Sequence, residues 1–257
     1  MTGHNKEIRM TTTLLRPTTT RTSVDAPRKH AFAAGVFYLV TFFASIPAVI
    51  LLNPVLNDAH YVVGAGADTR VTFACLLDVI NALAGIGSAV ALFSVVKRQH
   101  EGLALGLVMS RMFEAAVIMI GVVCLLGIVT LRQDGPASGA DQGSLIAAAQ
   151  SLVAVRNWTL LLGPGVMAAI NGLQLGTLMY RSRLVPRVIP TIGLIGVPVL
   201  LASCLCTLFG VFGQFSPAAL FFGLPIATWE FSLGCYLVVK GFRPAALAAL
   251  SSSATAA

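Results

Sequence analysis

Four charged side chains interrupt the long apolar stretches of this sequence: Asp78, Arg111, Glu114 and Glu230. A charge at the centre of a bilayer costs roughly 2.5–3.5 kcal/mol on insertion scales, so each of these residues needs a compensating role. Arg111 and Glu114 are three residues apart and share one face of a helix. Three carboxyl groups against one guanidinium leave at least one carboxyl neutral or in contact with water. The group is therefore suited either to binding a proton, ion or polar solute, or to clasping helices together.

Several neutral polar residues are expected at the same depth. Asn81 lies almost one helical turn from Asp78, and the Arg111 side chain is long enough to reach either Asp78 or Glu114. Asn171 and Gln174 are three residues apart on a later apolar stretch. Amides in such positions are typical of hydrogen bonds between membrane helices, with a role in a pocket as the alternative.

The motifs of several enzyme classes are missing from the sequence. All four histidines lie outside the apolar stretches, which leaves no bis-histidine haem site and no serine–histidine pair within the membrane. The zinc-protease pattern HExxH is also absent. The five cysteines fall within apolar stretches, where free cysteine behaves as a small hydrophobe. We therefore expect no catalytic residue, no metal site and no cofactor.

The composition identifies the elements that must position these residues. Of the 257 residues, 56% are hydrophobic and 11% are charged, against about 25% charged in an ordinary soluble domain. This composition excludes soluble, disordered and collagen-like classes. About 20 apolar residues in a helix span a hydrocarbon core of about 30 Å, and strand-like alternation is absent. The sequence predicts an all-α bundle in a membrane domain over 31–243, with six spans at about 31–52, 71–96, 102–131, 157–180, 188–212 and 217–239.

The basic residues predict the orientation of this bundle. The N-terminal tail, the second and fourth connections and the C-terminal end together carry thirteen lysines and arginines, whereas the other connections carry three. Cytoplasmic segments are enriched in such residues, so both termini are expected in the cytoplasm and the chain in the inner (plasma) membrane. The net charge of +7 therefore indicates contact with the lipid bilayer and not with nucleic acid. Residues 1–30 are expected to be a disordered basic tail, and residues 244–257 a flexible one.

The third connection has a pattern of its own. Turn residues at 134–139 precede an apolar stripe that begins at Leu145. Asp141 or Ser144 is suited to cap a helix there. The pattern predicts a short amphipathic helix over 144–156 on the outer membrane face, followed by Trp158 as an interfacial anchor.

Five segments together resemble a known family. They are RKHAFAAGVFYL at 28–39, the aspartate at 78, RMFEA at 111–115, LMYRSRLVPR at 178–187 and WEFSLGCYLVVKG at 229–241. Their order and spacing are similar to the prokaryotic membrane proteins of the domain of unknown function 4386, over about residues 28–243. The resemblance implies a six-helix inner-membrane protein with no assigned activity. The four charged residues found above fall at positions that match the family.

Two functions from different classes follow from the sequence. A small transporter or carrier would use the charged residues as its polar path for a small molecule or ion. A structural, sensory or partner-binding membrane protein would use them as an internal clasp. An intramembrane enzyme is the third hypothesis, and a non-enzymatic role is favoured because no pair of nucleophile and base is present. The sequence does not indicate a substrate or an oligomeric state.

Overall fold

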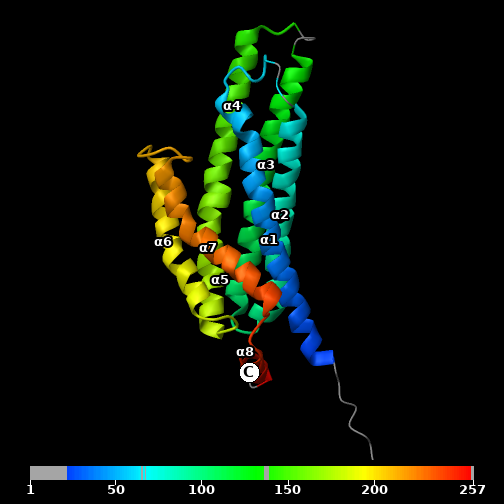
Figure 1. Cartoon of the computed structure of the whole chain (residues 1–257), viewed down its shortest axis with the longest axis vertical. Helices are drawn as coiled ribbons and strands as arrows, with labels where there is room; N and C mark the ends of the chain where they lie inside the picture. The colour runs from blue at the N-terminus through cyan, green and yellow to red at the C-terminus, as the bar shows by residue number, and fades with distance from the viewer. Residues whose placement is uncertain (1–21, 65, 67, 136–138, 256–257) are drawn as a thin grey trace, which may run out of the picture.

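The computed structural model describes residues 22–64, 66, 68–135 and 139–255, and within these ranges the chain is all-helical, with no strand (Figure 1). The helices are α1 (Thr22–Asn57), α2 (Asp68–Val96), α3 (Glu101–Asp134), α4 (Gln142–Leu160), the π-helix η1 (Leu161–Met167), α5 (Ala168–Ser182), α6 (Val188–Leu208), α7 (Pro217–Val239) and α8 (Pro244–Thr255). Because α4, η1 and α5 follow one another without a break, they form one helical run.

Six helical runs in the described part of the chain are long and apolar enough to cross a membrane. Their packing follows the order α1, α2, α3, α5, α6 and α7, and α7 returns to α1, so the runs form a closed ring. At one end α2, α3 and α4 extend beyond the loop that joins α6 to α7 (Figure 1). The ring therefore has an interior to which all six runs contribute.

Local sequence accounts for where several helices begin and end. The side chains of His100, Asp141 and Ser216 each accept a hydrogen bond from a first-turn amide of the helix that follows. Such caps satisfy backbone donors that have no partner within the helix. α5 ends where Arg183 adopts a left-handed conformation with φ 57°. Pro217 occupies the first turn of α7, where its missing N–H costs no hydrogen bond.

Two apolar cores lie along the bundle, and a polar layer lies between them. One core contains residues from the first and the last spans, α1 and α7, and includes Tyr38, Leu107 and Trp229. The other core lies further along α1, α2 and α3 and contains Leu52 and Ala115. Between Leu107 and Ala115 on α3 come Arg111 and Glu114, so the charged residues occupy the boundary between the two cores.

The structure corrects three expectations about the segments outside the spans. The helix predicted over 144–156 as a separate element on the membrane face is the first part of the continuous run Gln142–Ser182, and it packs along α3. Residues 22–30 of the tail expected to be disordered are helical, while residues 1–21 lie outside the described range. The tail at 244–257 contains α8, which packs its apolar residues against the first core. Apolar contacts explain the order of α8, because a polar tail would have none.

Candidate functional site

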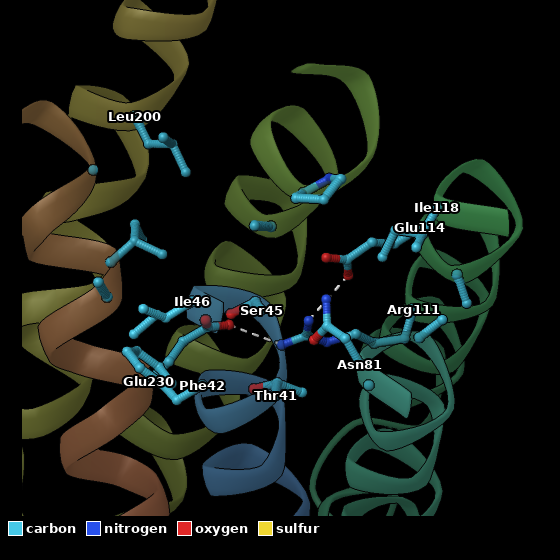
Figure 2. A pocket seen from close by; sticks show the side chains of 18 residues that line it. Thr41, Phe42, Ser45, Ile46, Asn81, Arg111, Glu114, Ile118, Leu200 and Glu230 are labelled. Carbon is cyan, nitrogen blue, oxygen red and sulfur yellow. Dashed lines mark hydrogen bonds and ion pairs between the residues drawn. The ribbon is translucent and has the colours of Figure 1, made fainter. Parts of the chain in front are cut away.

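The interior of the ring contains a charged cluster centred on Arg111 (Figure 2). Its Nη1 donates to Glu114 Oε2 at 3.0 Å, and its Nη2 donates to Glu230 Oε1 at 2.9 Å. Nη2 also donates to the Tyr38 hydroxyl at 3.2 Å. Arg111 is 6% exposed and Glu114 is 8% exposed. One buried cation thus joins α1, α3 and α7.

Two amides connect this cluster to α5. Asn171 Nδ2 donates to Glu114 Oε2 at 2.7 Å. The Ser110 hydroxyl lies within hydrogen-bonding distance of the side-chain oxygens of both Asn171 and Gln174. The amides predicted at membrane depth therefore make hydrogen bonds between helices, and Asn171 also contacts a carboxylate of the cluster.

A cavity of about 360 Å³ lies beside the cluster and is lined by Arg111, Glu114 and Glu230. Ser45 of α1 and Asn81 of α2 also line it, and neither side chain has a hydrogen-bond partner among the described residues. Figure 2 shows the Arg111 guanidinium between the carboxyl groups of Glu114 and Glu230. Most of the remaining lining is apolar, which is usual for a site that binds a small molecule.

Asp78 lies outside this cluster and has a cation of its own. Arg156 Nη2 donates to Asp78 Oδ2 at 3.0 Å, and both residues are at least nine-tenths buried. Of the two carboxylates that Arg111 was expected to be able to reach, the structure pairs it with Glu114. Arg156 reaches α2 past Gly121 of α3, where an added Cβ would lie 2.7 Å from Arg156 Cδ.

The second arginine changes the charge balance of the interior. Asp78 and Arg156 balance one another, whereas Glu114 and Glu230 share Arg111 alone. The cluster beside the cavity therefore carries one negative charge when its three groups are ionised. Asn81 lies between the two ion pairs, since it lines both the large cavity and a smaller one beside Asp78 and Arg156.

The helix that carries Arg156 and Asn171 changes its winding beside the cavity. η1 contains Pro164, which has no N–H to donate and lines the cavity wall. Ala168, the first residue after η1, lines it as well. π-helical turns are rare and occur frequently at functional sites. This turn lies between Arg156, which bonds Asp78, and Asn171, which bonds Glu114.

Three polar contacts were not foreseen from the sequence. Tyr38 and Ser110 are single hydroxyl residues among apolar neighbours, a pattern without a signal of its own. Arg156 was counted among the residues of an outer connection, because the polar residues around it suggested a surface helix. The one available signal was charge: a buried Asp78 needs a cation, and Arg156 is close in depth once the helix is continued. No group of three or more His, Cys, Asp or Glu side chains in the described ranges could hold a metal ion.

Fold and site together define a multi-pass helical membrane protein with an ionic cluster and a cavity inside a ring of six spans. The family described as Domain of unknown function (DUF4386) matches residues 33–241, and the chain belongs to this family. The match includes all four charged residues of the sequence prediction. No curated protein and no solved structure matches the chain.

Proposed function

We propose that this protein is a small carrier that moves a polar solute or ion through its ring of helices, with Arg111, Glu114 and Glu230 at the central site. The observation that carries the proposal is that all three residues line one cavity. Burying charges beside an open space in a membrane is costly unless a ligand or water contacts them. A cluster that only joined helices would be expected to exclude such a space.

The π-helical turn supports the same proposal. Irregular backbone at membrane depth is tolerated where it is buried in protein or lines a cavity, and π-helical turns occur frequently at functional sites. η1 changes the winding of the continuous run from Gln142 to Ser182 and lines the cavity through Pro164. A change in this turn would let the two halves of the run move separately.

Placement in the inner membrane with both termini in the cytoplasm belongs to the proposal. It is supported by the distribution of lysine and arginine. Because Arg156 is buried with Asp78, the connections on the opposite side retain only Arg70 and Arg132, against thirteen basic residues on the cytoplasmic side. The asymmetry is stronger than the sequence count suggested.

A second candidate function is structural, with the cluster as an internal clasp. The observation in its favour is that Arg111 bonds groups from α1, α3 and α7 at once. In this reading the protein supports or senses a partner, and the cavity is a packing defect that ligands do not enter.

Access to Ser45 from the two sides of the membrane distinguishes these functions. We would place Ser45→Cys in a variant whose five native cysteines are replaced, and react it with a membrane-impermeant cationic methanethiosulfonate. The reaction would be measured separately in right-side-out and inside-out vesicles. The matched control is Ser88→Cys on α2, because Ser88 is 1% exposed and does not line the cavity.

A carrier must open its site to each side in turn, so Ser45→Cys should react in both kinds of vesicle while Ser88→Cys reacts in neither. Reaction from one side only, or from neither, would contradict the carrier and leave the clasp as the better account.

A further inference from the structure

The unused oxygens of the cluster indicate what kind of ligand the cavity takes. Glu114 accepts both of its hydrogen bonds on Oε2, and Glu230 accepts its bond on Oε1. The other oxygen of each carboxylate has no partner among the described residues, yet neither is sealed from the cavity that both residues line. Glu114 is more than nine-tenths buried. Two free carboxylate oxygens, one from α3 and one from α7, are thus available to a ligand.

The charge of the cluster determines the sign of that ligand. Arg111 is the one cation among the residues that line the cavity, its two Nη atoms bond Glu114, Glu230 and Tyr38, and its unpartnered Nε is buried. An anion would add to the negative charge that the cluster already has in excess. A cation would instead neutralise the excess negative charge, and it would do so in a low-dielectric interior where the attraction is strong.

Size and lining separate an organic cation from a metal ion. A cavity of about 360 Å³ holds far more than one ion, because a water molecule takes about 30 Å³ of liquid volume. Phe42, Ile118 and Ile226 give it apolar walls, and Phe42 offers an aromatic ring on the wall of α1. Aromatic rings and carboxylates together are a usual environment for alkylammonium groups.

We propose that the cavity binds a small organic monocation, with its ammonium group at Glu230 and Glu114 and its apolar part against Phe42 and Ile118. This inference rests on the proposed carrier function and names the class of its substrate. Ser45 and Asn81 lie on the same cavity wall and supply neutral polar groups to the ligand.

The experiment compares two probes of nearly identical shape that differ in charge. Benzyltrimethylammonium carries a quaternary nitrogen, and neopentylbenzene has a carbon atom in its place. Binding of each probe to the full chain in lipid nanodiscs would be measured by the shift in thermal unfolding temperature over a concentration series. The variants are Glu230→Gln and, as a matched control, Glu101→Gln at the exposed start of α3.

We expect the cation to bind at least tenfold more tightly than its neutral analogue. Glu230→Gln should reduce this preference at least tenfold, and Glu101→Gln should leave it unchanged. Equal binding of the two probes, no binding of the cation, or an unchanged preference in Glu230→Gln would each overturn the inference. Should Glu230→Gln fail to fold, Asn81→Leu takes its place and should weaken cation binding.

The outcomes distinguish this inference from the carrier. Two-sided reaction of Ser45→Cys without preference for the cation would remove the substrate class and keep the carrier. Preference for the cation with one-sided reaction would keep a cation site and remove transport.

Discussion

Replacing Gly121 by alanine tests whether Arg156 reaches Asp78 through a gap in α3. A Cβ at this position would lie 2.7 Å from Arg156 Cδ and 2.8 Å from Thr159 Oγ1. Non-bonded carbon atoms normally approach to about 3.5–4.0 Å. The added Cβ would contact Cδ, which carries the guanidinium, so the guanidinium must move away from Asp78 to remove the overlap.

The magnitude follows from two opposing effects. Alanine is favoured over glycine within a helix by about 1 kcal/mol. Leaving a buried carboxylate without its partner costs roughly 3–5 kcal/mol. We therefore expect Gly121→Ala to lower the free energy of unfolding by about 2–4 kcal/mol, the opposite sign from helix propensity alone.

The assay is equilibrium unfolding in mixed micelles of dodecylmaltoside and SDS, followed by tryptophan fluorescence. The matched control is Gly223→Ala in α7, where an added Cβ meets nothing within 4 Å. This variant should be at least as stable as the parent. In an Asp78→Leu/Arg156→Ala background, the cost of Gly121→Ala should be smaller, because the pair is already gone and only the contact with Thr159 Oγ1 remains. A Gly121→Ala protein as stable as the Gly223→Ala protein would refute the reasoning.

Three further variants test other parts of the structure. Arg111→Leu leaves the buried Glu114 and the partly buried Glu230 without their cation. This change should cost roughly 3–5 kcal/mol of unfolding free energy, part of which Arg111→Leu/Glu230→Leu recovers; unfolding of both in micelles checks this. Hydrogen bonds from the Ser144 amide and side chain lower the pKa of Asp141. This cap therefore stabilises α4 at neutral pH and is lost as pH falls from the ordinary aspartate pKa of about 4 through that lowered value. The protection factors of first-turn amides, taken relative to the intrinsic exchange rate at each pH, should fall over that range, and in Asp141→Ala they should be low at every pH. Gly193→Ala places a Cβ 2.4 Å from the Trp229 ring, should cost about 1–3 kcal/mol, and is checked by thermal unfolding and the tryptophan emission maximum.

The sequence was sufficient to locate the spans and to identify Asp78, Arg111, Glu114 and Glu230 as charges within them, but it missed the buried Arg156. Long apolar runs are the strongest signal in a membrane protein, and the predicted starts at 188 and 217 coincide with those of α6 and α7. Arg111 and Glu114 were placed on one face by their spacing, and the structure pairs them.

What the sequence could not provide was the pairing between distant helices. Which carboxylate contacts which arginine depends on how each helix is rotated about its axis. A single sequence does not specify contacts between residues that are 78 or 119 positions apart. The prediction of a separate surface helix over 144–156 was wrong for a different reason. Polar residues of this segment face both the protein interior and the surroundings, so a helix that packs along α3 has the composition of a surface helix.

The π-helical turn also fixes an angle. Each residue of an α-helix turns about 100° around its axis, and a π turn adds a residue to the hydrogen-bonded loop. η1 therefore sets the phase between Arg156, which must face Asp78, and Asn171, which must face Glu114. Removing one residue from Leu161–Met167 would rotate one of these side chains away from its partner. Members of the family with a shorter turn would consequently need a different donor for the carboxylate at the position of Glu114.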